Sequence, residues 1–245
     1  MSVRLHVNVD HVATLRNARG TRYPSPLAAA EACLAAGADG ITAHLREDRR
    51  HIVDADMGDL RALCGQKQRT FNLEMAATDE MVAIAQHAKP DVCTLVPERR
   101  EERTTEGGLD AVAGGDLLAR RVRKLIDAGI RVSLFIAADE AQIARSKAIG
   151  AVQIELHTGE YAHGREGELA RLAEGAKRAH AMGLEVAAGH GLTQDNVPAL
   201  VQIPDIVELN IGHAVIADAV FVGITEATKA YRAAIERGTS CRRVS

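Results

Sequence analysis

The sequence predicts an α/β fold, a single (β/α)8 TIM barrel that forms one domain over residues 1–245. Three observations indicate this fold: the length of 245 residues, eight short apolar runs rich in β-branched residues, and helix-like segments between those runs. A (β/α)8 barrel typically takes about 250 residues, so one barrel accounts for the whole chain. An open, doubly wound sheet built from the same units is the alternative.

The eight predicted strands are each too short for a helix of ordinary length. They cover residues 4–10, 40–44, 70–75, 91–95, 131–136, 151–156, 185–188 and 206–209. Nearly continuous apolar runs are typical of parallel strands, which are buried on both faces. Parallel strands that alternate with helices imply right-handed crossovers, and eight such units favour closure into a barrel.

Alanine-rich or charged amphipathic segments separate the strands and predict helices over 26–36, 57–63, 79–88, 116–128, 140–149, 166–182, 196–201 and 216–235. Ser25 before Pro26 and Thr78 before two acidic residues are typical N-caps. Glycine after a helical pattern favours the left-handed conformation that ends many helices. Such glycines stand before four strands, at Gly37, Gly129, Gly150 and Gly183.

The composition excludes several classes of function. A net charge of −3 and an aromatic content of 2%, without tryptophan, argue against nucleic-acid binding. Apolar runs stay well below the ~20 residues that cross a bilayer, and the start lacks the apolar core of a signal peptide. The four cysteines are far apart and without a CxxC pair, so we expect reduced thiols and a cytoplasmic protein.

Polar residues collect where the predicted strands end, and the carboxyl ends of barrel strands share one face. Because side chains alternate along a strand, Asn8 and Asp10 are expected to point to the same side. One such residue alone fits a structural role, with Glu74 paired to Arg46 or Asp10 capping a turn. Six ends share the pattern, which predicts a catalytic pocket: Asn8 and Asp10, His44 and Arg46, Asn72 and Glu74, Glu155 and His157, His190, and Asn210 and His213.

Two parts of this face are expected to bind anions. Glycine beside His190 and before His213 lets the main chain approach a ligand, and barrels frequently bind phosphate after strands seven and eight. Arg19, Arg46 and His51 offer a second site, since arginine can grip phosphate through two parallel hydrogen bonds. Two anion sites across one pocket indicate two phosphorylated groups.

Two charged runs, residues 47–50 and 98–103, mix both signs of charge and are expected to be solvated. They lie in the long connections 45–56 and 96–115, on the carboxyl side of their strands. The second run begins a connection that is long enough to cover the pocket.

The positions of the lysines and of Cys93 limit the types of reaction that the chain could catalyse. The six lysines lie away from the predicted strand ends, which argues against a Schiff-base aldolase. Cys93 lies inside a predicted strand, where it is poorly placed as a nucleophile. A metal site built from His44, Glu74 and His190 remains an alternative, since imidazole and carboxylate are suitable ligands. Otherwise the residues predict general acid–base catalysis.

Longer motifs make the sequence similar to a known family. They are NVDHVATLRNARGT, GADGITAHLREDRRHI, NLEMA, LVPERREERTTEGGLD, VSLFI, IELHTGEYA, AGHGLT and ELNIGHA, in order from Val7 to about the last predicted helix. On these motifs the chain resembles the pyridoxine 5'-phosphate synthase family. The resemblance implies a barrel with a few additional helices in a cytoplasmic homo-octamer. It also implies condensation of 1-deoxy-D-xylulose 5-phosphate with 3-amino-2-oxopropyl phosphate to pyridoxine 5'-phosphate, inorganic phosphate and water, with no metal or organic cofactor.

The resemblance assigns roles to residues of these motifs. It implies that His44 and Glu74 accept protons, that His190 donates a proton, and that Glu155 stabilises charge in the transition state. It implies contacts to deoxyxylulose phosphate from Asp10, His11, Arg46, His51 and Thr104. It implies contacts to the amino-ketone phosphate from Asn8, Arg19, Gly191, Gly212 and His213.

Two other functions remain as alternatives: a metal-dependent aldolase or isomerase on sugar phosphates, and an inactive sugar-phosphate binding protein. Sensitivity to chelators separates the first from the synthase. The intact set of His44, Glu74 and His190 argues against the second. The expected partners are small phosphorylated substrates, rather than nucleic acid or a membrane.

Overall fold

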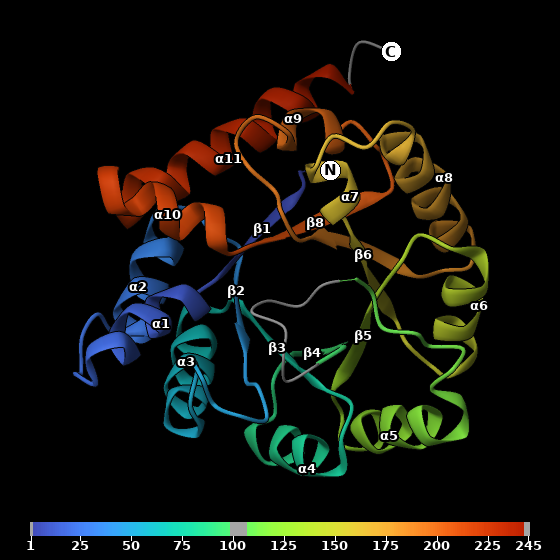
Figure 1. The fold of residues 1–245 in the computed structure, drawn as a ribbon, viewed down its shortest axis with the longest axis horizontal. Helices are drawn as coiled ribbons and strands as arrows, with labels where there is room; N and C mark the ends of the chain where they lie inside the picture. Colours follow the sequence, from blue (N-terminus) through green and yellow to red (C-terminus); the bar gives the residue numbers. More distant parts are fainter. Residues whose placement is uncertain (1, 99–106, 243–245) are drawn as a thin grey trace.

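Eight parallel strands close into a barrel in the order β1 to β8, with β1 paired to both β2 and β8 (Figure 1). The computed structural model describes residues 2–98 and 107–242. The strands are β1 Arg4–Asn8, β2 Gly40–His44, β3 Thr70–Ala76, β4 Val92–Val96, β5 Arg131–Ile136, β6 Gln153–His157, β7 Glu185–Gly189 and β8 Ile206–Ile211. The predicted barrel is confirmed, and the open sheet is excluded.

Helices form the outer ring of the barrel (Figure 1). Within the described residues they are α1 Asp10–Arg19, α2 Pro26–Ala35, α3 Asp54–Lys67, α4 Asp79–Ala88, α5 Gly115–Asp127, α6 Glu140–Ala148, α7 Gly159–Ala162, α8 Glu168–Ala181, α9 Val197–Leu200, α10 His213–Val222 and α11 Ile224–Cys241. Apolar side chains from these helices and from the outer faces of the strands form one continuous core.

The local signals at helix ends are confirmed. The side chains of Ser25 and Thr78 accept hydrogen bonds of 3.3 and 3.4 Å from amides in the first turns of α2 and α4. The four glycines before strands have positive φ angles of 103, 79, 101 and 73°, at Gly37, Gly129, Gly150 and Gly183.

Two features of the helices differ from the prediction. The apolar pattern over residues 216–235 predicts one helix, but the chain forms α10 and α11, which are separated at Gly223. This residue has a φ of 82°, a conformation that interrupts the helix. The prediction also lacks α1 and α7, because both begin within polar strand-end segments that resemble loops.

The barrel interior contains a chain of buried polar side chains. Thr42 Oγ1 donates to Asn210 Oδ1 at 2.7 Å, and Asn210 Nδ2 donates to Glu155 Oε2 at 2.7 Å. On the other side, Asn72 Nδ2 donates to Thr42 Oγ1 at 3.3 Å and Thr94 Oγ1 donates to Asn72 Oδ1 at 2.9 Å. These bonds satisfy polar groups that water cannot reach, and they connect five strands beneath the site.

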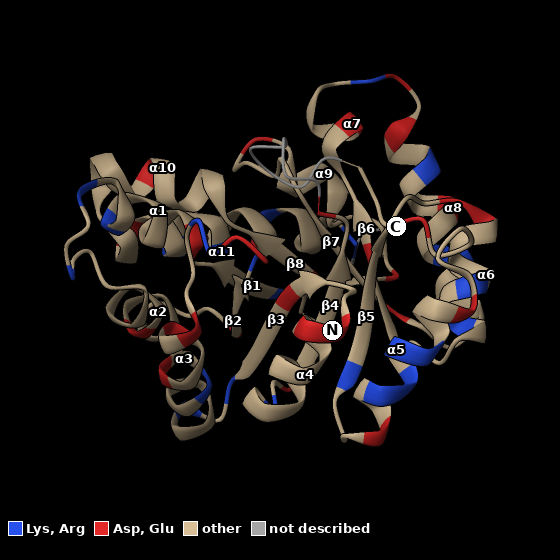
Figure 2. Ribbon diagram, turned by 60° about the horizontal axis from the view of Figure 1, so that its bottom comes forward, with Lys and Arg blue, Asp and Glu red and all other residues tan. Residues whose placement is uncertain are grey.

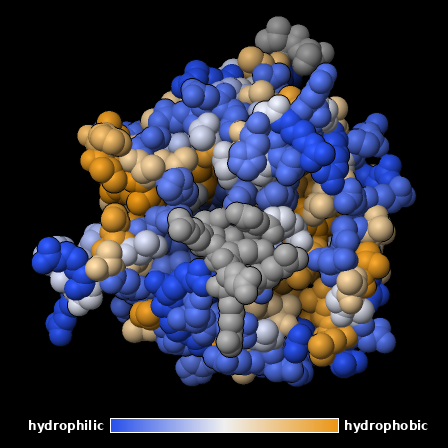
Figure 3. Space-filling view, in the orientation of Figure 1, coloured by the Kyte–Doolittle hydropathy of each residue, from blue (hydrophilic) through white to orange (hydrophobic). Residues whose placement is uncertain are grey.

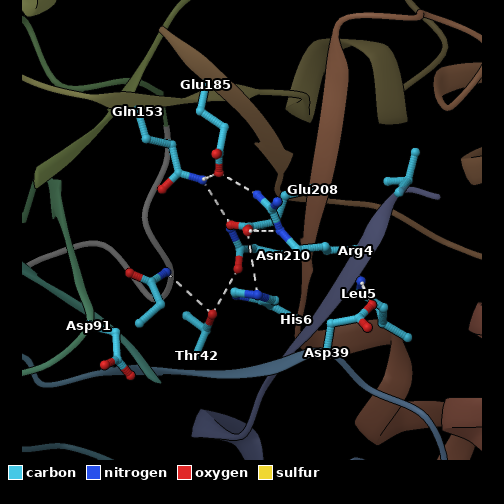
Figure 4. Close-up of polar contacts among 12 residues, drawn as sticks. Arg4, Leu5, His6, Asp39, Thr42, Asp91, Gln153, Glu185, Glu208 and Asn210 are labelled. Carbon is cyan, nitrogen blue, oxygen red and sulfur yellow. Dashed lines mark hydrogen bonds and ion pairs between the residues drawn. The ribbon is translucent and has the colours of Figure 1, made fainter. Parts of the chain in front are cut away.

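A second polar cluster lies toward the amino-terminal ends of the strands (Figure 4). Arg4 Nε donates to Glu208 Oε2 at 2.9 Å, and Arg4 also pairs with Glu185. Gln153 Nε2 donates to Glu208 Oε1 at 3.1 Å. His6 Nε2 lies 3.4 Å from Glu208 Oε2, but among the described residues neither nitrogen of this buried ring has a hydrogen-bond partner.

The outer surface combines charged and apolar regions. Both signs of charge are interspersed on helices such as α6 and α8 (Figure 2). Apolar side chains gather over α10 (Figure 3), where Val220, Phe221 and Val222 are exposed. In the described part of the chain, every helix is too short or too polar to cross a membrane.

Candidate active site

A cavity of about 480 Å³ opens at the carboxyl ends of the strands, the face where the sequence predicts a pocket. All four residues expected to act in catalysis line it: His44, Glu74, Glu155 and His190. Eight of the expected substrate contacts also line it: Asn8, Asp10, His11, Arg46, His51, Gly191, Gly212 and His213. Residues of seven strands, and of the segments that follow strands such as β7 and β8, thus meet around one space.

One expected substrate contact, Arg19, lies away from the cavity, and a second cannot be placed. Arg19 is exposed in the last turn of α1 and is not part of the cavity lining. Thr104 lies outside the described residues.

The structure adds cavity residues that the sequence analysis does not assign to the site. Phe135, at the end of β5, and Thr193, after β7, line the cavity. Arg50 also lines it while remaining exposed, as expected for the run 47–50. Its proximity to Arg46 and His51 in the sequence is the one signal that could have indicated this position.

The expectation that Glu98 is solvated is wrong. Its side chain is 5% exposed, and Oε1 lies 2.8 Å from His44 Nε2. The burial of Glu98 depends on tertiary structure, because its partner His44 lies at the end of β2 and is distant in the sequence. The mixed-charge run alone gives no sign of this partner. The other members of that run lie outside the described residues.

Glu74 belongs to a group of acidic side chains around Asn8. Asn8 Nδ2 donates to Asp10 Oδ2 at 2.9 Å and to Glu74 Oε2 at 3.4 Å. Burial, followed by the negative charges of Glu155 and Asp10, raises the pKa of Glu74 well above its ordinary value. A carboxyl group with a raised pKa is suited to take up and return a proton near neutral pH.

Glu155 is a second buried carboxyl group at the cavity. Burial, followed by the charge of Glu208, raises its pKa to about 8, although the hydrogen bond from Asn210 acts in the opposite direction. Perturbed carboxyl groups that face one cavity are typical of catalytic sites.

Four histidines form two edge or tilted ring pairs at the cavity. The rings of His11 and His213 are 4.9 Å apart, and those of His44 and His51 are 5.8 Å apart. Burial is the main cause that lowers the pKa of both His11 and His51. A neutral imidazole ring can accept a proton, and the imidazolium that forms can return it.

His190 has an unusual backbone conformation, with a φ of 86°. Positive φ is uncommon for residues other than glycine and is held only where the surroundings impose it. Thr158 supplies such contacts, because its hydroxyl lies 2.7 and 2.6 Å from the carbonyl oxygens of Gly189 and His190. The His157 ring lies 5.1 Å from that of His190, and burial lowers the pKa of His157 to about 4.

Two parts of the cavity are suited to anions. Helix α10 begins at His213, and Gly212, His213 and Ala214 line the cavity, so the N-terminus of a helix, which favours anions, lies at the cavity. At another part of the lining, Arg46 and Arg50 provide positive charge. Both regions line the same cavity, which is suited to ligands with more than one anionic group.

Part of the cavity also offers potential metal ligands. Asp10, His44 and His51 each place a potential ligand atom within 4.8 Å of the others. This set differs from the predicted alternative of His44, Glu74 and His190. His44 already meets Glu98 through Nε2, and Asp10 Oδ1 already accepts the main-chain N–H of His44 at 2.8 Å.

Comparisons with known proteins extend these observations. The model of the family described as "Pyridoxal phosphate biosynthesis protein PdxJ" matches residues 5–237. The chain is 57% identical over 244 residues to "Pyridoxine 5'-phosphate synthase" of Xanthobacter autotrophicus, with 96% of this chain and 94% of that protein covered. It is 58% identical over 222 residues to the protein of that name from Gluconobacter oxydans, with 91% and 94% covered.

A solved structure shares the fold alone. "Thiamine phosphate pyrophosphorylase" from Pyrococcus furiosus superposes with a TM-score of 0.65 at 15% identity, with 96% of each chain covered. The family match over nearly the whole chain, together with relatives above 50% identity, decides the classification. The chain belongs to the pyridoxal phosphate biosynthesis protein PdxJ family.

Proposed function

We propose that this chain is a pyridoxine 5'-phosphate synthase, with the substrates and products that its motifs imply. The observation that carries the proposal is that His44, Glu74, Glu155 and His190 line one cavity, which is also lined by the start of α10 and by Arg46 and Arg50. Membership of the PdxJ family supports it.

In the proposed reaction, the amine of 3-amino-2-oxopropyl phosphate attacks the ketone of 1-deoxy-D-xylulose 5-phosphate and loses water to give an imine. His44 and Glu74 remove protons, and His190 returns protons to departing hydroxyl groups. Raised pKa values make Glu74 and Glu155 able to hold a proton at neutral pH, as a proton-transfer sequence requires.

One substrate also loses its phosphate as inorganic phosphate. The amide groups at the start of α10, or the side chains of Arg46 and Arg50, stabilise the negative charge that develops on such a leaving group. An aldol-type ring closure and a further loss of water give the aromatic pyridine. As the motifs imply, the proposed reaction uses no metal or organic cofactor, and because each step is a proton transfer, an addition or an elimination, it requires no oxidant or reductant.

The assembly and location follow the family resemblance. We propose a cytoplasmic homo-octamer, and the exposed apolar residues Val220, Phe221 and Val222 on α10 are suited to contacts between copies. Three of the cysteines are buried free thiols, which is compatible with a reducing compartment.

The test is to mix the purified protein with both substrates in the presence of a chelator. Pyridoxine 5'-phosphate, followed by its fluorescence, and inorganic phosphate are expected to form in equal amounts. Activity that disappears with chelator and returns with added metal would favour the metal-dependent aldolase or isomerase instead.

Glu74→Gln tests the assigned chemistry. Turnover is expected to fall by about 10²–10⁴-fold, the usual contribution of a general acid or base. Binding of inorganic phosphate, measured by calorimetry, is expected to persist. Near-normal turnover in this variant would remove Glu74 from the mechanism.

A further inference from the structure

We propose that Glu98 is a positioning residue that orients the His44 ring and stabilises its protonated form during the reaction. The inference rests on the proposed function, in which His44 accepts a proton. It adds a residue that the sequence motifs do not assign to the site and that the charged run 98–103 predicts to be solvated.

The contact between the two side chains is short and buried. His44 Nε2 lies 2.8 Å from Glu98 Oε1, and the side chains are 6% and 5% exposed. A carboxylate at this distance accepts a hydrogen bond, so a neutral His44 ring carries its hydrogen on Nε2. Its Nδ1 is then the basic nitrogen, and His44 lines the cavity where a substrate would lie.

Glu98 is itself held by the main chain of two neighbouring segments. Oε1 accepts from the Ala76 amide at the end of β3 at 3.1 Å, and Oε2 accepts from the Glu47 amide after β2 at 3.2 Å. Both oxygens therefore have fixed donors, and the carboxylate has little freedom to rotate. Three adjacent strand ends are joined at this point.

Glu98 also remains ionised despite its position. Burial acts to raise its pKa, but the hydrogen bond and charge of His44, the Glu47 amide and the charge of Arg46 together lower it below its ordinary value. A fixed negative charge beside His44 lowers the free energy of the imidazolium that forms when His44 takes a proton. This is the role of a carboxylate behind a catalytic histidine in general acid–base sites.

Other groups around His44 cannot replace this contact. Asp10 Oδ1 accepts the main-chain N–H of His44 rather than a ring nitrogen. His51 meets His44 ring to ring, with centroids 5.8 Å apart, and carries no negative charge. Among the described contacts, Glu98 is the carboxylate that reaches the ring.

Three substitutions test the proposal. Glu98→Gln keeps the shape and removes the charge, Glu98→Asp keeps the charge but shortens the side chain, and Glu98→Ala removes both. We expect Glu98→Gln to lower kcat by roughly 10²-fold with KM for both substrates nearly unchanged, because the charge acts on proton transfer and not on binding. Glu98→Asp is expected to keep more activity than Glu98→Gln.

Formate supplies a readout that a purely structural role would not change. In Glu98→Ala, formate can occupy the vacated space and is expected to restore part of kcat, while it leaves wild-type kcat unchanged. Glu160→Gln is the matched control, since Glu160 is an exposed carboxylate after β6 that pairs with Arg165, and it should retain wild-type rates. Circular dichroism and thermal unfolding establish that each variant is folded.

The outcomes separate the two proposals. If the wild type forms no pyridoxine 5'-phosphate, the proposed function fails and the role of Glu98 in that reaction fails with it. If the wild type is active but folded Glu98→Gln keeps its kcat, only the role of Glu98 is overturned. A loss confined to KM, or a folded Glu98→Ala variant that formate does not rescue, also overturns it.

Discussion

The hydroxyl oxygen of Thr158 lies 2.6 Å from the main-chain carbonyl oxygen of His190, although the two residues are 32 positions apart. The same hydroxyl lies 2.7 Å from the Gly189 carbonyl oxygen, and the Thr158 amide donates to that oxygen at 2.9 Å. These contacts hold the end of β7 against the end of β6. They offset the cost of the positive φ at His190 and keep its ring at the cavity.

Thr158→Val is therefore expected to impair both stability and turnover. The variant keeps the shape of the side chain but leaves a carbonyl group without its partner, which costs about 1–3 kcal/mol in the free energy of unfolding. Displacement of His190 is expected to lower kcat by up to about 10²-fold. Urea unfolding and steady-state kinetics measure the two effects. Thr158→Ser retains the hydroxyl and should stay close to the wild type; equal loss in both variants would contradict this explanation.

The loop after β7 contains Gly191, and Gly164, which follows α7, provides a matched control for its substitution. Both have similar left-handed φ angles, 73 and 77°, but a Cβ at Gly191 would lie 2.6 Å from Ala162 Cβ, whereas one at Gly164 would have open space. Alanine at either position bears the conformational cost of about 1–2 kcal/mol. Gly191→Ala also displaces the cavity lining, so its KM should rise while that of Gly164→Ala should not. A similar KM in both variants would show that the loop tolerates the contact.

The raised pKa of Glu155 is expected to make the free energy of unfolding depend on pH. Its pKa rises from 4.5 to about 8 on folding, so the folded protein binds the extra proton. The corresponding stabilisation is full below pH 4.5 and is lost as the pH rises through about 8. Glu155→Gln removes this titration. The Tm of the variant relative to the wild type should therefore increase from pH 5 to pH 9, at about 2–4 °C for each kcal/mol, while turnover falls.

The exposed Glu236→Gln is the control for this comparison, and its Tm difference should not vary in the same way. A Tm difference for Glu155→Gln that stays constant across the pH range would show that Glu155 is ionised in the folded protein at neutral pH.

The lowered pKa of His6, at the other end of the barrel, is expected to have the opposite effect on how the free energy of unfolding depends on pH. Burial is the main cause that lowers its pKa below 6.5, with charges of Glu208, Arg4, Asp39 and Glu185 around it. Below pH 6.5 the unfolded chain binds a proton that the folded protein does not, so the free energy of unfolding falls as the pH falls. His6→Leu should reduce this slope between pH 6.5 and 5 in urea unfolding.

Substitution of the exposed His87 by leucine should leave the slope unchanged. Identical slopes for the wild type and His6→Leu would mean that His6 becomes protonated in the folded state with little cost.

Much of the fold could be predicted from short-range signals in the sequence. Runs of β-branched residues predicted all eight strands, with the bounds of Gly40–His44 and Arg131–Ile136 correct at both ends. Ser25 and Thr78 identified helix starts because an N-cap acts on amides only three residues away. The polar strand ends identified the face of the site, since parallel strands in a barrel place their carboxyl ends together.

Contacts between distant segments were decided only by the tertiary structure. The pairing of His44 with Glu98 joins residues 54 positions apart, and that of Thr42 with Asn210 joins residues 168 apart. Neither has a local signal, because a hydrogen bond between distant residues depends on barrel closure and register rather than on neighbouring residue types. The raised pKa values of Glu74 and Glu155 and the positive φ of His190 have the same origin, since burial, nearby charge and imposed backbone geometry exist only once the barrel has formed.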